Sequence, residues 1–290
     1  MPPPRVIYVA GWGRSGSTVL NRLLSGPDLV GVGELRWLWR RGVLEGQSCS
    51  CGQRWETCEL WGPLLGRLGR EQETDARTLA RELDDLGRRS SSMLRQRMRL
   101  AGGSHRYVAL LKRVYELIGE ITGASVVLDT SKHPGHAVLT RATGLDVTIV
   151  HLVRDPRAVV WSHLRRKPAP QGVVARDMRT RPAPYVAARW TARNALVELG
   201  VKPDIRLRYE DMVSRTDEAL VRVRRAIGSS PETGSGLNHV IAGNLDRFDR
   251  APLQLRLDEE WKERQPRGQR LVTTAIALPL LHRYGYNSHG

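Results

Sequence analysis

Cationic and hydroxyl side chains stand at three places in this sequence where an apolar run ends. The first is the glycine-rich turn Gly11 to Ser17, which contains Arg14 and Gly16 and leads through Thr18 into a segment of helical apolar spacing. Backbone N–H groups of such a turn, together with a helix N-terminus, bind phosphate oxygens. Glycine permits the positive φ and the close backbone approach that this binding needs. The turn therefore predicts a phosphate site.

The same turn nearly fits the nucleoside-triphosphate loop G-x-x-x-x-G-K-[ST] between Gly11 and Gly16, but Ser17 stands at the lysine position. Without that lysine the site lacks the cation that holds β- and γ-phosphates and the usual magnesium arrangement. Arg14 is the cation of this loop instead. The alternative is that the glycines serve only as a tight connection after the first strand, and the spacing alone does not exclude this.

Lys132 and Arg154 are the second and third cations, and each follows a short apolar run of strand type. The carboxyl ends of parallel strands meet at one edge of a sheet, so both side chains are expected beside the glycine-rich turn. Ser162 lies two turns along the helix expected after Arg154 and can approach the same ligand. The two apolar runs are Ser125 to Leu128 and Val147 to Leu152. These cations argue against a purely structural turn.

Glu34 follows the apolar stretch Leu29 to Val32 and is expected at the same edge, where a carboxylate can serve as general base for a hydroxyl. An alternative is that Glu34 only begins the helix expected over Leu35 to Val43, where an acid suits the helix dipole. His133 and His239 are rival bases, because imidazole titrates near neutrality. A lone histidine in either place is more often structural, and the sequence does not decide among the three.

The three cysteines form a C-x-C-x6-C cluster at Cys49, Cys51 and Cys58. Zinc with a fourth ligand from elsewhere is one interpretation, although structural zinc sites usually show paired C-x2-4-C spacings. A disulfide between Cys51 and Cys58 is a second. Free thiols are the third, and a reducing compartment favours them.

The apolar runs alternate with helical segments, which predicts an α/β fold with a P-loop-type parallel sheet flanked by helices in a single domain over 1–290. Residues 49–120 contain the cysteines and then helical, arginine-rich stretches, and are expected to form a helical cap inserted between strands. Residues 167–184 hold four prolines and little periodicity, and are expected to form a mobile loop near the acceptor. No internal repeat is visible.

The formal net charge of +16 indicates an anionic partner but does not choose between nucleic acid, a membrane surface and a phosphorylated small molecule. Aromatic residues are not interleaved with the basic ones, which argues against nucleic acid. No apolar run is as long as a membrane span, and the N-terminus shows no secretory pattern. A soluble cytoplasmic protein is expected.

With these motifs in place, the chain resembles the sulfotransferases that depend on 3′-phosphoadenosine 5′-phosphosulfate (PAPS), of the bacterial kind related to tyrosylprotein and carbohydrate sulfotransferases. GRSGST resembles the family's 5′-phosphosulfate loop and LVRDPRAVVWSH its 3′-phosphate motif. GELR resembles the segment with the glutamate base, DTSKHP the segment with a catalytic lysine, and GNLDRF with LDEEW the C-terminal loop that closes over the nucleotide.

The resemblance implies a role for each matching residue. Glu34, Lys132 and Arg14 are the implied catalytic residues. Arg154 and Ser162 hold the 3′-phosphate. The remaining nucleotide-binding residues are Gly13, Arg14, Ser15, Gly16, Ser17, Thr18, Tyr209, Asn244 and Arg247.

Sulfuryl transfer moves a compact, highly charged group in line between two oxygens, so its catalysis consists mostly of positioning and charge stabilisation. This arrangement requires no metal. The expected acceptor is a hydroxyl, of a small molecule, sugar or lipid rather than of a protein. A P-loop kinase-like phosphotransferase and a non-enzymatic binder of anionic ligands are the alternatives. The sequence leaves the acceptor and the oligomeric state open.

Overall fold

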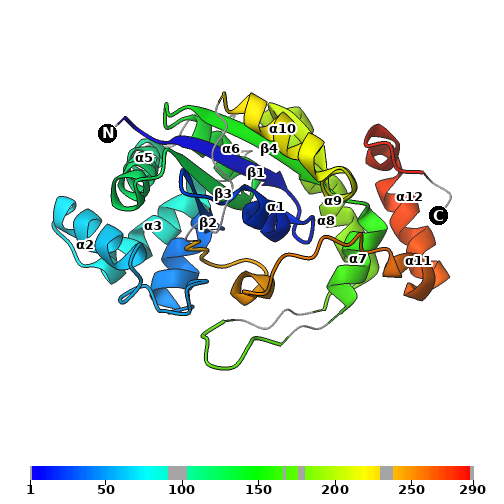
Figure 1. The fold of residues 1–290 in the computed structure, drawn as a ribbon, viewed down its shortest axis with the longest axis horizontal. Helices are drawn as coiled ribbons and strands as arrows, with labels where there is room; N and C mark the ends of the chain where they lie inside the picture. The colour runs from blue at the N-terminus through cyan, green and yellow to red at the C-terminus, as the bar shows by residue number, and fades with distance from the viewer. Residues whose placement is uncertain (1, 91–102, 166–167, 176–179, 229–237, 288–290) are drawn as a thin grey trace.

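A five-stranded parallel sheet forms the centre of the computed structural model, which describes residues 2–90, 103–165, 168–175, 180–228 and 238–287 (Figure 1). The strand order is β2-β3-β1-β4-β5, and every neighbouring pair is parallel. The predicted α/β fold is confirmed. The strands are β1 (Arg5–Gly11), β2 (Leu29–Gly33), β3 (Val126–Lys132), β4 (Val147–Val153) and β5 (Ile205–Arg208).

Helices cover both faces of this sheet, as the continuous apolar strands require. Ile7 and Val9 of β1 pack against α1, α9 and α10, whereas Tyr8 and Ala10 face α6 and the turn that follows α8. Beyond β4, a further cluster joins α7, α8 and α12. The helices are α1 (Ser17–Leu24), α6 (Pro134–Arg141), α7 (Pro156–Leu164), α8 (Ala183–Leu196), α9 (Tyr209–Ser214), α10 (Thr216–Ala226), α11 (Glu260–Arg264) and α12 (Arg267–Arg283).

Three helices of the expected insertion, α2 (Trp61–Glu71), α3 (Ala76–Ser90) and α5 (Gly103–Thr122), pack around one hydrophobic core with β2 (Figure 1). Residues 91–102 of that insertion, with the helical stretch expected there, lie outside the described residues. The helix expected over Leu35 to Val43 is a 3₁₀ turn, Leu35–Trp37, followed by a wider π-helical stretch, Leu38–Leu44.

Residues 239–241 lie along the β2 edge of the sheet. His239 N donates to Gly31 O at 3.1 Å, Ile241 N to Val32 O at 3.0 Å, and Glu34 N to Ile241 O at 3.0 Å. In Figure 1 this orange segment then crosses from β2 towards α7, through the 3₁₀ turn η4 (Leu245–Phe248). It therefore runs across the edge where the strands end.

The loop expected over 167–184 is irregular where it is described, and α8 begins at Ala183, inside that range. Residues 166–167 and 176–179 lie outside the described residues. Within the described part of the chain, none of the helices combines the length and the apolar character needed to cross a membrane.

Candidate active site

The glycine-rich turn connects β1 to α1 in the conformation that the sequence predicts. Gly16 has a φ of 91° and precedes the first residue of α1, and Arg14 also has a positive φ of 68°. A Cβ on Gly16 would lie 2.4 Å from Cδ2 of Tyr209, so only glycine lets the turn pass this ring. The first residues of α1, Ser17 to Val19, line the space beside the turn, and the N–H groups at a helix start have no partner within the helix.

That space is a cleft of about 1770 Å³ at the carboxyl ends of the strands. Of the predicted site residues, Ser15 is buried beneath the turn and Arg247 lines a small neighbouring cavity. The structure brings all the others together along the cleft: Gly13, Arg14, Gly16, Ser17, Thr18, Glu34, Lys132, Arg154, Ser162, Tyr209 and Asn244.

Lys132 lies between the turn and Glu34. Its Nζ is 2.8 Å from Glu34 Oε1 and donates to Ser17 Oγ at 3.2 Å and to Thr130 O at 2.8 Å. Burial raises the pKa of the Glu34 carboxyl, but the charges of Lys132 and Arg41 outweigh this and hold that pKa below its ordinary value. Glu34 is therefore an ionised carboxylate at neutral pH, paired with a cation that also contacts the glycine-rich turn.

The end of β3 is held by a buried carboxylate. Asp129 accepts hydrogen bonds from Ser131 N at 2.8 Å and from the Tyr115 hydroxyl of α5, also at 2.8 Å. Burial raises the pKa of Asp129 to about 6, although these hydrogen bonds oppose the shift. Lys132, one residue beyond Ser131, has a left-handed φ of 62°. This fixed strand end positions the Lys132 side chain, and one inserted helix contributes to it.

Arg154 is buried directly after β4 and contacts the turn at Arg14, whereas Lys132 contacts it at Ser17. Its Nη1 donates to Arg14 O at 3.2 Å and its Nη2 to Asp258 Oδ2 at 3.1 Å. Its guanidinium carbon lies 4.3 Å from the centroid of the Tyr209 ring. Arg154 Nε is buried and has no hydrogen-bond partner, which is the kind of donor that a bound anion would satisfy.

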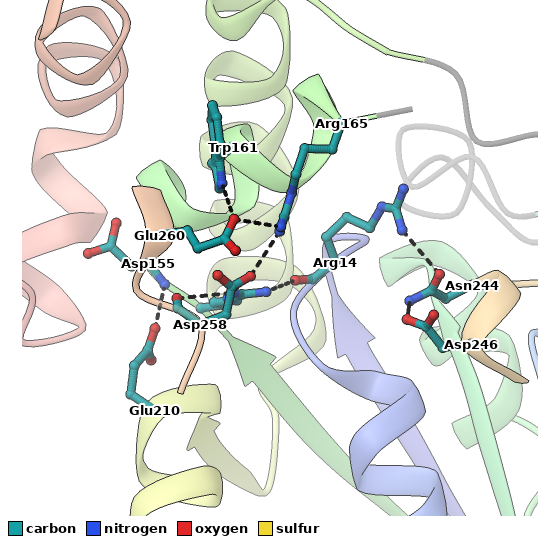
Figure 2. Close-up of polar contacts among 10 residues, drawn as sticks. Arg14, Asp155, Trp161, Arg165, Glu210, Asn244, Asp246, Asp258 and Glu260 are labelled. Atoms are coloured by element: carbon teal, nitrogen blue, oxygen red, sulfur yellow. Dashed lines mark hydrogen bonds and ion pairs between the residues drawn. The ribbon is translucent and has the colours of Figure 1, made fainter. Parts of the chain in front are cut away.

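The residues that follow Arg154 fix its place. Asp155 caps α7 by accepting from Arg157 N at 2.8 Å, and Asp155 N donates to Glu210 Oε1 at 3.0 Å (Figure 2). Burial raises the pKa of the Glu210 carboxyl, which also accepts from the Tyr286 hydroxyl at 2.7 Å. The strand end that carries Arg154 is thus attached to α9 and, through Glu210 and Tyr286, to the C-terminal part of the chain.

The C-terminal segment contacts the turn through Arg14. Arg14 Nη1 donates to Asn244 Oδ1 at 3.1 Å, and Asn244 Nδ2 donates to Asp246 Oδ2 at 2.6 Å (Figure 2). Burial lowers the pKa of Arg14, and Asp246 opposes the shift. Arg247 is also buried, and its Nε and Nη2 have no partner. Like Arg154, it offers donors to an anion.

Several residues of the cleft were not predicted as site residues, among them His163, Arg165 and Asp258. Burial, with Arg14 and Arg181 nearby, lowers the pKa of His163 to about 4, so its imidazole is neutral. Arg165 Nη2 donates to Asp258 Oδ2 at 2.9 Å, so this carboxylate is shared by two arginines. The position of His163, directly after Ser162 on one helix, was the available signal; Asp258 had none beyond its place in LDEEW.

The two rival bases lie elsewhere. His133 caps α6 by accepting from His136 N at 3.4 Å, and burial together with Arg36 lowers its pKa to about 2. His239 Nδ1 lies 3.2 Å from Cys58 Sγ, among the cysteines. Neither histidine lines the cleft. Glu34 is the one of the three candidates that does.

Comparison with known proteins connects this geometry to a family. The sequence profile described as "Sulfotransferase family" matches residues 4–232. The chain belongs to the sulfotransferase family. The matched range includes the turn at Gly11 to Ser17 and the ends of all five strands. The family match of this sulfotransferase therefore covers most of the chain, beyond the motifs themselves.

Solved structures of sulfotransferase domains share the fold. The sulfotransferase domain of the Synechococcus PCC 7002 olefin synthase aligns with a TM-score of 0.53 and 19% identity, over 98% of this chain and 96% of that chain. The sulfotransferase domain from the curacin biosynthetic pathway gives 0.54 and 18%, over 98% of both chains. Sulfotransferase STF9 from Mycobacterium avium gives 0.51 and 14%, over 99% of this chain and 78% of that chain. Comparison with curated proteins finds no match.

Proposed function

We propose that this sulfotransferase moves the sulfuryl group of PAPS to a hydroxyl of a small-molecule, sugar or lipid acceptor. One observation supports this most strongly. Buried arginine donors at one end of the glycine-rich turn and a paired lysine and carboxylate at the other end face the same cleft. A nucleotide with phosphates at both its 3′ and 5′ positions would place one anionic group at each of these ends of the turn.

The arginine end suits the 3′-phosphate. Arg154 has one buried N–H without a partner, and its guanidinium is stacked on the Tyr209 ring, which restricts its orientation. Ser162, one of the cleft residues, adds a hydroxyl donor on α7. A planar guanidinium binds phosphate oxygens through two parallel hydrogen bonds, which gives the site its geometric selectivity.

The turn and Lys132 suit the phosphosulfate. The N–H groups at the start of α1 stabilise the α-phosphate oxygens, and Arg14 and Lys132 stabilise the negative charge that grows on the bridging oxygen. Lys132 already contacts Ser17 Oγ at 3.2 Å, so its ammonium requires little movement to reach that oxygen. The residues supply positioning and charge for an in-line transfer.

Glu34 accepts the proton of the acceptor hydroxyl. Its carboxylate is ionised at neutral pH, since the charges of Lys132 and Arg41 outweigh burial and lower its pKa. As the acceptor oxygen forms a bond to sulfur, the bond from sulfur to the phosphate oxygen breaks, and Glu34 takes the proton. Lys132 lies between the base and the turn, so it offsets charge on both sides of the reacting group.

The test is transfer from PAPS to a panel of hydroxyl acceptors, read as the mass gain of one sulfuryl group, with the desulfated nucleotide PAP as the second product. Phenols, sugars, lipid alcohols and a tyrosine peptide form the panel. Radiolabelled ATP with the same acceptors tests the kinase alternative. Product from PAPS and none from ATP supports the proposal, whereas phosphorylated product, or PAPS hydrolysis at the same rate with and without every acceptor, contradicts it.

A further inference from the structure

All three cysteines of the chain lie together with a histidine that is remote in sequence. The ligand atoms of Cys49, Cys51, Cys58 and His239 lie within 4.8 Å of one another. Cys49, Cys58 and His239 are buried, and none of the cysteines forms a disulfide. The proposed transfer of a sulfuryl group uses none of these four side chains.

Three of the distances between these atoms are close to those of a tetrahedral metal site. Cys51 Sγ and Cys58 Sγ are 3.8 Å apart, and His239 Nδ1 lies 3.8 Å from Cys49 Sγ and 3.2 Å from Cys58 Sγ. With zinc bonds of about 2.3 Å to sulfur and 2.0 Å to nitrogen, the edges of a ligand tetrahedron are about 3.8 Å between sulfurs and about 3.5 Å between sulfur and nitrogen.

The backbone that carries the cysteines is fixed by hydrogen bonds of its own. Cys49 to Gly52 form a tight turn, in which Gly52 N donates to Cys49 O at 2.9 Å and Gly52 has a left-handed φ of 92°. Cys49 N donates to Gln53 O at 2.8 Å and Cys58 N to Arg54 O at 3.0 Å. Such hydrogen bonds hold the backbone of the proposed ligands in place.

The histidine is held in place from its own side as well. Trp61 Nε1 donates to His239 O at 3.1 Å, and Ser50 bonds both neighbours of the histidine, donating to Asn238 O at 2.7 Å and accepting from Val240 N at 2.9 Å. The four ligands thus come from two segments that pair through their backbones. The three thiols and the imidazole lie close together, and hydrogen bonds hold the backbone around them. One metal cation could accept a bond from each of the four ligand atoms.

We propose that Cys49, Cys51, Cys58 and His239 bind a structural zinc ion that fastens the start of the inserted segment to the strand-like segment beside β2. A closed tetrahedral set of three thiolates and one imidazole suits zinc, and it leaves no position open for a substrate. Two residues after His239, Ile241 pairs with Glu34, and Asn244 then reaches Arg14. The zinc site therefore anchors the wall of the cleft that begins at His239.

The test is metal analysis of the full-length protein, purified without chelator and free of any metal-affinity tag. About one zinc ion per chain is expected, and the Cys58→Ser and His239→Ala variants should hold less than about a tenth of that amount. His282→Ala, which removes an exposed histidine at the end of α12, is the matched control and should keep its zinc. Metal content does not depend on nucleotide or acceptor, so this result is independent of the proposed function.

A second measurement uses only the wild-type protein, so it tests the zinc site even if the variants fail to fold. The three thiols of the native protein should be protected from a thiol reagent until zinc is displaced, and then all three should react as zinc is released. Cobalt(II) substitution should give the visible spectrum of a tetrahedral thiolate site. A native, metal-free protein with three reactive thiols, a Cys51–Cys58 disulfide found by mass spectrometry, or bound iron in place of zinc would each overturn the proposal.

Discussion

The wall of the cleft that carries Lys132 and Arg154 and the wall formed by residues 238–258 are built in different ways. In the first wall, the side chains proposed to act on the nucleotide follow the ends of β1, β3 and β4, and the hydrogen bonds of a parallel sheet fix the spacing of their backbones. In the second wall, the backbone has little regular structure, and side chains such as Asn244 and Asp258 connect it to the first wall.

The two kinds of wall suit two different tasks, charge stabilisation and adjustable nucleotide binding. The sheet fixes the backbone positions of the cations at its strand ends, which suits the stabilisation of charge at a fixed point. A segment attached by side-chain hydrogen bonds can exchange those bonds for bonds to a nucleotide. We therefore expect substitutions in the first wall to affect chemistry and affinity strongly, and substitutions in the second wall to adjust affinity.

The largest expected effect is that of Glu34→Gln, which keeps the volume of the side chain but removes the proton acceptor. Single-turnover transfer at saturating PAPS should fall by about 10² to 10⁴. PAP affinity, measured by calorimetry, should not weaken, because the change removes a negative charge from the cleft. Asp249→Asn is the matched control, since it removes a cleft carboxylate that is not the proposed base. A Glu34→Gln enzyme that keeps more than about a tenth of the wild-type rate would exclude Glu34 as the base.

Arg154→Ala should weaken PAP binding by about 1.5–3 kcal/mol, or about 10- to 150-fold, because it removes charge-assisted hydrogen bonds to the 3′-phosphate. Arg225→Ala removes the same charge from an exposed position on α10 and should leave the affinity unchanged. Isothermal titration of both variants makes the comparison. Equal losses in the two would mean that net charge, rather than the position of Arg154, determines the affinity.

Gly16→Ala tests the contact between the turn and Tyr209. Its Cβ would lie 2.4 Å from the Tyr209 ring, so the ring must shift and its stacking with Arg154 must change, and PAP binding should weaken about 3- to 30-fold. Gly144→Ala introduces alanine at a similar φ of 74° where no atom lies within 4 Å of the added Cβ. It controls for the cost of the left-handed backbone, about 1–2 kcal/mol of stability. PAP affinities that match in the two variants would leave no role for the Tyr209 contact.

Asp258→Asn has the smallest expected effect and acts in the opposite direction. Asp258 occupies the guanidinium groups of Arg154 and Arg165, so neutralising it should strengthen PAP binding about 2- to 5-fold, the scale of a partly exposed ion pair. Glu259→Gln, an exposed neighbour whose carboxylate pairs with Lys262 instead, is the control. Weaker PAP binding to Asp258→Asn in a titration at low salt would show that this carboxylate positions Arg154 for the phosphate rather than competing with it.

The sequence predicts the first wall well, and the reason is local. Each of its cations lies within four residues of the end of an apolar run, and parallel strands bring such positions to one edge whatever the intervening chain does. The α/β sheet could be predicted on the same basis, and the structure confirms it. The end of β3 was less predictable, since Asp129 to Lys132 are polar yet continue the strand by pairing with β1, and Tyr115 donates a hydrogen bond to Asp129.

The second wall depends on contacts between residues that are far apart in the chain. The spacing of residues along the sequence does not indicate such contacts. The C-x-C-x6-C cluster could not be assigned a role, because its partner His239 is 181 residues away from Cys58. The regular helix expected over Leu35 to Val43 is instead a 3₁₀ turn and a π-helical stretch packed against the inserted helices. Asp258 reaches Arg154 only because the segment crosses the whole edge of the sheet.

The central claim is that one cleft recognises both the 3′- and the 5′-phosphate of the nucleotide, with Arg154 at the 3′ end. Calorimetric titration of the wild-type protein with PAP and with AMP tests it most directly, because the two ligands differ only in the 3′-phosphate. PAP should bind at least about tenfold more tightly, and Arg154→Ala should remove most of that preference. Equal affinities for PAP and AMP, or a preference that survives in Arg154→Ala, would contradict the account.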